Sequence, residues 1–231
     1  MKNIFTILAL TIGFSMNAQM DDNSANNNSA GTYSVAMGYG TTASGSYSTA
    51  MGDFTSASGN YSTAMGSDTY AIGNYSTAMG DFTSASGNYS TAMGEGTEAF
   101  GNYSTAMGDG TRAMGDWSTA MGQFTEASGF SSTAMGYNTT ASGGTSTAMG
   151  WYTTASGNFS STMGYQTISS DYGSLVIGQN NLSGSTVTNS ATAYDADNTA
   201  FVIGNGTASN AKSDAFKVMF NGDATLSNDL T

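Results

Sequence analysis

The sequence contains no cysteine, no proline and no histidine. Without cysteine the chain has no disulfide framework, no thiol nucleophile and no thiolate metal site. Without histidine it lacks the usual general base and the commonest metal ligand of proteins. Basic residues are also scarce, because 4 Lys+Arg stand against 16 Asp+Glu and the formal net charge is −12. This balance argues against binding to nucleic acids or to anionic membrane surfaces, both of which need basic side chains.

Large aliphatic residues are the next shortage. After residue 19 there are four Ile, five Val and four Leu, thirteen in all, over more than 200 residues. This number is too small for one ordinary globular core. The apolar residues are instead mostly Ala, Met and aromatics. Such a composition is typical either of a disordered chain or of a repeat protein with thin layers of small residues.

The first 19 residues read as a secretory signal peptide. Lys2 provides the positive charge, Ile4 to Phe14 form an apolar stretch, and Ala18 is a small residue at a possible cleavage site. The stretch is too short for a membrane span, although a buried N-terminal strand or helix is an alternative. We therefore predict an exported protein, secreted or on the cell surface. Residues 20–33, rich in Asn, Asp and Ser, are predicted to be a disordered leader.

Glycine recurs with a period of 14 residues through the middle of the chain. The first series comprises Gly38, Gly52, Gly66, Gly80, Gly94, Gly108, Gly122, Gly136, Gly150, Gly164 and Gly178. A second series is offset by seven residues and fails only at Asp171. Ten full repeats start at Ser34 and at every fourteenth residue after it, and an eleventh opens at Ser174. We number the places of each repeat 1 to 14; residues 48–61 read STAMG-DF-TSASG-NY.

Within each half repeat, S-x-A-x-G or T-x-A-x-G, the pattern has a period of two, which indicates a β-strand. A coiled coil is excluded, because one residue in seven is Gly and no leucine seam exists. Two short strands per 14 residues describe one coil of a solenoid, with coils stacked about 4.8 Å apart. The sequence therefore predicts an all-β, narrow parallel β-solenoid. We expect the Ser, Ala and Gly residues of the halves, and the Thr that opens the second half, to point inward.

The fourth place carries an apolar residue in every repeat and is expected to point outward. It comprises Met37, Met51, Met65, Met79, Met93, Met107, Met121, Met135, Met149, Met163 and Ile177. A soluble monomer rarely exposes such a continuous apolar stripe, so we interpret it as a permanent interface between chains. The alternative is that these Met side chains line the core of a monomer.

Three further columns of residues would test whether the coils stack in register. The ninth place has Glu98, Arg112 and Glu126 in succession, which predicts an ion-pair ladder. The thirteenth place predicts an amide ladder of Asn60, Asn74, Asn88 and Asn102. The fourteenth predicts an aromatic stack of Tyr47, Tyr61, Tyr75, Tyr89, Tyr103 and Trp117. In later coils the aromatics move to the sixth place, at Tyr137, Trp151 and Tyr165.

The repeated S-x-A-x-G…T-x-A-x-G unit resembles the head repeat of trimeric autotransporter adhesins of the YadA kind, also called the haemagglutinin/invasin (Hep/Hag) repeat. The resemblance covers Ser34 to Gly178. It implies a left-handed parallel β-roll, a homotrimer, and display on a cell surface for adhesion. The Met stripe falls at the usually aliphatic place of the family's N-S-V-A-I-G motif, where Met is a softer and less specific filler.

Residues 179–231 depart from the repeat and are predicted to form an irregular insertion followed by a short β connector. Strands are expected at 200–204 and 215–220, with a tight turn at 221–223 leading into 224–226. This tail resembles the connector that precedes self-cleaving chaperone domains in trimeric tail fibres. No part of the sequence resembles that chaperone or a membrane-anchor barrel, and we expect no membrane insertion by this chain.

The residues offer little for catalysis. The serines have no adjacent base, so we predict no enzyme, no cofactor and no metal site. Asp81, Glu95 and Asp109 hold the sixth place of three neighbouring coils and leave two readings open, a Ca²⁺ site or a solvated acidic edge.

The predicted function is attachment by an adhesin head, with the chain itself (a homotrimer) and a host protein, matrix protein or surface glycan as partners. The candidate ligand surface on the second strand comprises Tyr70, Ile72, Phe100, Arg112 and Met114. These residues alternatively stabilise only their own stack. Two other functions are considered, a fibre spacer without a ligand and an ice-binding solenoid, the latter suggested by regular Thr columns at the second and eighth places.

Overall fold

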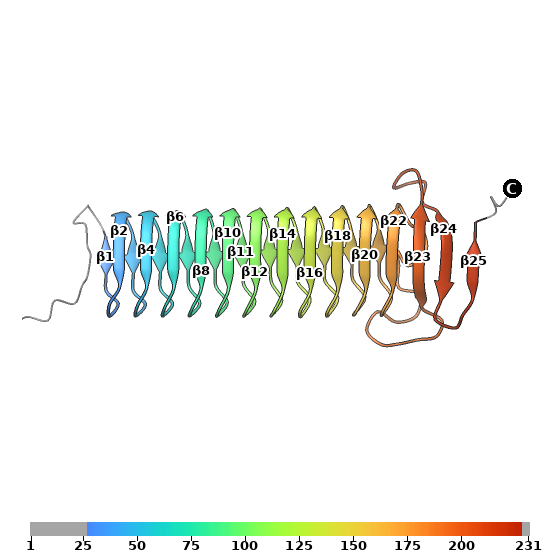
Figure 1. Ribbon diagram of the computed structural model, residues 1–231, viewed down its shortest axis with the longest axis horizontal. Helices are drawn as coiled ribbons and strands as arrows, with labels where there is room; N and C mark the ends of the chain where they lie inside the picture. Colours follow the sequence, from blue (N-terminus) through green and yellow to red (C-terminus); the bar gives the residue numbers. More distant parts are fainter. Residues whose placement is uncertain (1–26, 228–231) are drawn as a thin grey trace, which may run out of the picture.

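The computed structural model describes residues 27–227, which form an elongated rod of β-strands and turns (Figure 1). The predicted signal peptide and residues 20–26 of the predicted leader lie outside the described residues. Within residues 27–227 there is no helix long and apolar enough to cross a membrane. The chain is a parallel β-solenoid, as the two-residue period predicted.

Each coil contributes one strand of five residues and one of two residues. The long strands are β2 (Val35–Tyr39), β4 (Thr49–Asp53), β6 (Thr63–Ser67), β8 (Thr77–Asp81), β10 (Thr91–Glu95), β12 (Thr105–Asp109), β14 (Thr119–Gln123), β16 (Thr133–Tyr137), β18 (Thr147–Trp151), β20 (Ser161–Tyr165) and β22 (Leu175–Gln179). The short strands are β1 (Asn28–Ser29), β3 (Thr42–Ala43), β5 (Ser56–Ala57), β7 (Tyr70–Ala71), β9 (Ser84–Ala85), β11 (Glu98–Ala99), β13 (Arg112–Ala113), β15 (Glu126–Ala127), β17 (Thr140–Ala141), β19 (Thr154–Ala155) and β21 (Ile168–Ser169).

The two kinds of strand form two parallel sheets, a long-strand sheet and a short-strand sheet. Neighbouring coils pair without any shift, so that each residue lies opposite its equivalent 14 positions away. Met93, for example, lies between Met79 and Met107. The predicted in-register stacking is therefore confirmed, and every place of the repeat becomes a column along the rod.

The interior of the coils is narrow and is filled by small side chains. The alanines at the third and tenth places, from Ala36 to Ala155, are fully buried and make up the hydrophobic core. Ser at the first place and Thr at the eighth place are buried as well. Some of the Ser hydroxyls bind the backbone at the adjoining turn, as when Ser62 Oγ donates to the carbonyl of Gly59 at 2.6 Å. Others, such as Ser90 Oγ, and Thr hydroxyls such as Thr97 Oγ1 have no hydrogen-bond partner among the described residues. A core made of alanine explains how the chain folds with so few large aliphatic residues.

The prediction that both glycines of the repeat point inward is wrong for the fifth place. The second-half glycines, such as Gly87, are buried, whereas the first-half glycines, such as Gly94, lie at the surface. Gly80 at the fifth place has φ +127°, and a Cβ there would overlap the carbonyl oxygen of Gly94 in the next coil. Glycine is required there by close backbone approach and by an unusual φ, not by a lack of interior space.

Each coil turns twice, and residues at both turns adopt the left-handed backbone conformation. At the seventh place Phe82 has φ 51°, and at the fourteenth place Tyr89 has φ 58°. The turn that contains Tyr89 is closed by the N–H of Ser90, which donates to the carbonyl of Gly87 at 3.3 Å. Gly and Asn adopt this conformation at low cost, whereas bulky side chains rarely do.

The solenoid begins before Ser34, the first residue of the predicted repeats. Asn28 and Ser29 of β1 pair with Thr42 and Ala43 of β3, and Gly31 donates to the carbonyl of Ala43 at 3.1 Å. Residues 27–33 therefore belong to the first coil, although the composition had placed them in a disordered leader.

The C-terminal strands follow the prediction within one residue at either end. The strand β23 (Thr199–Asn205) extends the long-strand sheet in parallel beside β22, with Ile203 opposite Ile177. The strands β24 (Asp214–Met219) and β25 (Ala224–Leu226) then add to it antiparallel (Figure 1). The expected tight turn joins them, and Met219 N–H donates to the carbonyl of Asp223 at 2.8 Å.

Buried polar side chains end the short-strand sheet. Asp171, the residue that breaks the glycine series, is fully buried. Its carboxylate accepts the N–H of Thr188 at 2.6 Å, the hydroxyl of Thr188 at 2.8 Å and the N–H of Thr199 at 2.8 Å. The amide of Asn181 binds both the N–H and the carbonyl of Ile168, each at 2.8 Å. Asn181 thus takes the place of the strand that would have followed β21.

Candidate functional site

The predicted interface residues, Met37 through Ile177, lie in one column on the outer face of the long-strand sheet. In this single chain nearly all of them are half-buried, because each side chain is flanked by its equivalents in the coils above and below. The alternative of a Met-lined core is wrong, since alanine fills the interior. The column is continuous and apolar along eleven coils, while its role as an interface stays a prediction.

The outward Thr column at the second place lies on the same face as the Met column, whereas the Thr column at the eighth place is buried. Each outward Thr therefore has Met as its neighbour two residues along the strand. This face lacks the paired outward threonines that the ice-binding hypothesis needs.

The candidate ligand surface on the short-strand side is only partly contiguous. Tyr70, Ile72, Phe100 and Met114 are all exposed, but the coil that carries Ser84 separates the first two from Phe100. Phe100, Arg112 and Met114 come from adjacent coils.

The ion-pair ladder at the ninth place is confirmed. Arg112 Nε lies 2.9 Å from Glu98 Oε2, and an Arg112 Nη lies 3.8 Å from Glu126 Oε2. Arg112 therefore forms ion pairs with carboxylates of both neighbouring coils. These pairs partly neutralise the positive charge that Arg112 could offer to a binding partner.

The aromatic column at the fourteenth place forms a stack of seven rings. It starts one ring earlier than predicted, at Tyr33, and ends at Trp117. From Tyr61 to Tyr103 the ring centroids are 4.7 to 4.9 Å apart and the planes differ by 2 to 3°. Phe130 then packs edge-on against Trp117 at 5.1 Å and ends the stack.

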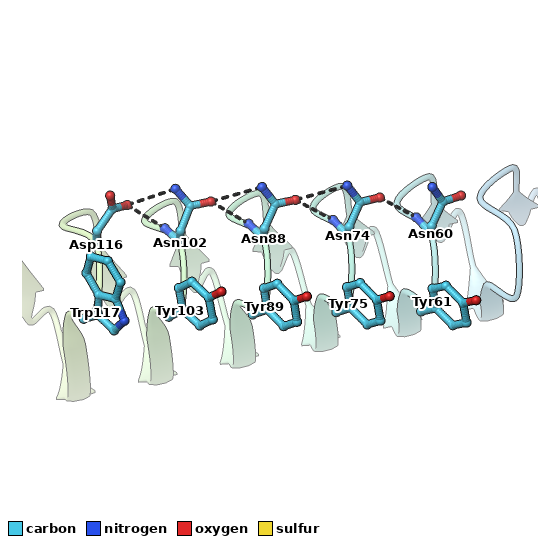
Figure 2. Close-up of a pocket in the computed structure, with 10 residues that line it drawn as sticks. All are labelled: Asn60, Tyr61, Asn74, Tyr75, Asn88, Tyr89, Asn102, Tyr103, Asp116 and Trp117. Carbon is cyan, nitrogen blue, oxygen red and sulfur yellow. Dashed lines mark hydrogen bonds between the residues drawn. The ribbon is translucent and has the colours of Figure 1, made fainter.

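The amide column at the thirteenth place forms a hydrogen-bonded ladder beside these rings (Figure 2). Asn88 Oδ1 accepts the backbone N–H of Asn74 at 3.0 Å and its side-chain Nδ2 at 3.2 Å. The same double contact joins Asn88 to Asn102 and Asn102 to Asp116. The predicted ladder is confirmed, and it ends on a carboxylate that the sequence analysis had not included.

The two columns together line an open groove of about 520 Å³ that runs along the rod. We call it the Tyr–Asn groove; its lining residues are Asn60, Tyr61, Asn74, Tyr75, Asn88, Tyr89, Asn102, Tyr103, Asp116 and Trp117. Amide groups form one wall and rings the other, as Figure 2 shows. Sequence reasoning found both columns but missed the groove, although the repeated dipeptide Asn-Tyr was its signal.

The acidic residues of the sixth place lie on the other turn of the coil. Asp81, Glu95 and Asp109 are in register in three adjacent coils, and Asp109 Oδ2 accepts a hydrogen bond from Gln123 Nε2 at 2.8 Å. Among the described residues no group of three acidic side chains is arranged to hold a metal ion. Glu95 is exposed, and Asp81 and Asp109 are half-buried.

A second aromatic group occupies the sixth and seventh places of later coils. Tyr137 and Trp151 stack with centroids 4.2 Å apart, and Tyr152 packs edge-on against Tyr137 at 5.5 Å. A side-chain hydrogen bond with Tyr137 raises the pKa of Tyr152 above its ordinary value. The predicted shift of aromatics to the sixth place is thus confirmed for the Tyr137–Trp151 pair.

The comparisons with known proteins agree with this geometry. The family model of the YadA head domain repeat matches residues 29–55, 57–83, 85–111, 113–139, 127–153 and 141–161, more than half of the chain. A search of curated proteins found no match. The matched segments cover the solenoid from its first coil through the Tyr–Asn groove and the second aromatic group. The chain therefore belongs to the YadA head domain repeat family.

Proposed function

We propose that this protein is an adhesin-like head module that is exported to the cell surface and works as a homotrimer. The observation that carries the proposal is the Met column, which runs along coils of the YadA head type. An unbroken apolar stripe of this length marks an interaction surface. In a trimer the three stripes pack around a common axis, which leaves the short-strand sheets and the coil corners available to partners.

Oligomeric state is the first test of this function. Size exclusion with light scattering is expected to give the mass of three chains. Because each coil is thin, we expect the monomer to be unstable alone, so that stability depends on protein concentration. A folded monomer at micromolar concentration would contradict the proposal.

A charge in the Met column tests where the interface lies. Met93→Asp places one carboxylate per chain in a desolvated contact, which is costly without a partner, so we expect loss of the trimer. Ser58→Asp is the matched control, since Ser58 is exposed on the short-strand side and its variant is expected to keep the mass of wild type. Equal behaviour of the two variants would place the interface elsewhere.

Adhesion is the third test. Immobilised protein is expected to retain cells or matrix proteins. A variant with Tyr70, Phe100, Arg112 and Met114 all replaced by Ser is expected to retain fewer if the short-strand surface binds the partner. Unchanged adhesion by a variant that remains trimeric would show that the partner binds to another surface. No adhesion by either the variant or the wild-type protein would favour the spacer function.

A further inference from the structure

We propose that the Tyr–Asn groove binds a single extended chain of a neutral, β-linked polysaccharide that lies parallel to the rod axis. This inference rests on the proposed function, because it gives a ligand class to an adhesin-like module. It uses a surface other than the Met column and other than the short-strand patch, so it is tested separately.

The rings of the groove lie at a turn that requires the left-handed conformation but does not require an aromatic residue. Tyr61, Tyr75, Tyr89 and Tyr103 all have φ of 57 or 58°, a region that bulky side chains rarely adopt. At the opposite turn of nearby coils the same conformation is held by Gly96 and Gly110. At the fourteenth place of later coils, Ser131 and Thr145 adopt the same conformation with φ of 51 and 55°. The turn alone therefore does not explain the unbroken run of Tyr in the groove.

The rings remain accessible despite their stacking. Tyr61, Tyr75, Tyr89, Tyr103 and Trp117 are each 48 to 52% exposed. The edges of these rings and the hydroxyls of the four Tyr residues form one wall of the groove (Figure 2). Such a wall offers an apolar body and a polar rim, which suits a ligand with both C–H surface and hydroxyl groups.

The opposite wall supplies hydrogen-bond donors. Each carboxamide carries two N–H groups, and in Asn74, Asn88 and Asn102 the ladder uses one side-chain N–H, at 3.2 Å. The ladder leaves the second N–H of each of these three amides unused. One ring and one amide therefore recur in the coils of Asn60, Asn74, Asn88 and Asn102, and the last coil of the groove carries the carboxylate of Asp116 instead.

The spacing of the rings along the rod favours an extended polymer whose units advance by a similar distance. The rings recur every 4.7 to 4.9 Å, which is close to the advance of one sugar in an extended β-linked glycan. An extended peptide advances by about 3.3 Å per residue and loses register with the coils. Phe130 against Trp117 closes one end of the aromatic wall.

Charge selects a neutral ligand. Nine of the ten lining residues are uncharged, and the tenth, Asp116, lies at the closed end. The whole chain has a net charge of −12, so its field repels anionic polysaccharides. With no basic side chain in the groove, a carboxylate or sulfate of an acidic glycan would find no counter-charge.

Trp117 provides a reporter inside the groove. The chain has two tryptophans, and Trp151→Phe leaves Trp117 as the single one, so its fluorescence reads the groove in the assembled protein. Acrylamide is expected to quench Trp117 efficiently. A Trp117 shielded from acrylamide in the assembly would mean that another chain covers the groove, and it would overturn the proposal.

Titration then tests the ligand class. Cellohexaose or chitohexaose, both neutral and β-linked, is expected to give a saturable change in Trp117 fluorescence. Maltohexaose, which is α-linked, and an anionic alginate hexamer are expected to bind at least about ten-fold more weakly. No binding of either β-linked hexamer, or equal affinity for all four probes, would overturn the proposal.

Substitutions at matched turns locate the site. Tyr75→Asn with Tyr89→Asn removes two rings while keeping a residue that tolerates the left-handed conformation, and we expect at least about a ten-fold loss of affinity. Phe82→Asn makes the same change at the other turn, where φ is 51°, and is expected to leave affinity within about two-fold. Tyr75→Phe with Tyr89→Phe keeps the stack and removes only the hydroxyls, with an expected several-fold loss.

Affinity that is unchanged in both double variants would overturn the proposal. The mass of each preparation and its adhesion to matrix proteins are measured in parallel. If a variant loses glycan binding but keeps its mass and its adhesion to matrix proteins, the effect is confined to the groove. A monomeric protein would contradict the proposed function and still allow the groove to be read through Trp117.

Discussion

The regular coils and the C-terminal end of the rod are held together in opposite ways. In the coils, each residue stacks on its own equivalent, and the core is a repetition of alanines. At the C-terminal end, single buried polar side chains make several hydrogen bonds each. Asn198 accepts the N–H groups of Asn189 and Ser190 and donates to the carbonyl of Ser190. Repetition spreads stability evenly along the rod, whereas the end concentrates it in a few residues that occur once.

The largest effect is expected from enlarging the alanine core. Ala92 is fully buried between two close strands, and Ala92→Leu overpacks the coil at a cost of about 3 kcal/mol, the upper part of the usual range. Chemical denaturation is expected to show this loss. Because each coil contacts only its neighbours, hydrogen exchange should show the loss of protection centred on that coil. Stability equal to wild type would show that the interior has spare room.

A smaller and strictly local effect is expected at the C-terminal end. Asp171→Ala leaves the N–H groups of Thr188 and Thr199 without their acceptor, at a cost of about 2–3 kcal/mol. Hydrogen exchange is expected to rise in residues 181–205 while β8 to β14 keep their protection. Asp171→Asn, which retains an acceptor oxygen, should lose less. Uniform loss along the rod would contradict the contrast between the two regions.

The smallest effect is expected for the surface ladder at the ninth place. Arg112→Ala removes two exposed ion pairs, and such pairs contribute about 0.2–1 kcal/mol. Thermal unfolding is expected to shift slightly at low ionic strength and not at all in about 1 M NaCl, where the Debye length is about 3 Å. A shift that persists in high salt would show that Arg112 acts through packing instead.

The same contrast explains how far the sequence predicts this structure. The 14-residue period gave the fold class, the register and the columns, because a period reports what every coil shares. Asp171 interrupts the glycine column and Asn181 lies outside the repeats. Asp171 binds partners 17 and 28 residues away, so no pattern revealed the roles of these two residues. The fifth-place glycine was misassigned because its φ near +127° ends the in–out alternation before the turn.

The groove shows a different limit of sequence reasoning. The Asn and Tyr columns are each evident from the period, yet their joint cavity depends on the left-handed turn that sets the two side chains apart. Tyr at such a position is unexpected from backbone preferences alone. A strained turn is therefore where local rules failed, as is common where a surface has a role in binding.

The amide ladder has a polarity along the rod. Every carboxamide from Asn74 to Asn102 donates toward the C-terminal end and accepts from the N-terminal side, so the amide dipoles align and reinforce one another. In such a ladder the last residue leaves no donor without an acceptor only if its side chain accepts hydrogen bonds and does not donate them. Asp116 is such a group, and the next residue of the column is Phe130. The order Asn, Asn, Asn, Asp therefore gives the ladder a net dipole along the rod axis. The positive end of this dipole lies toward the carboxylate of Asp116.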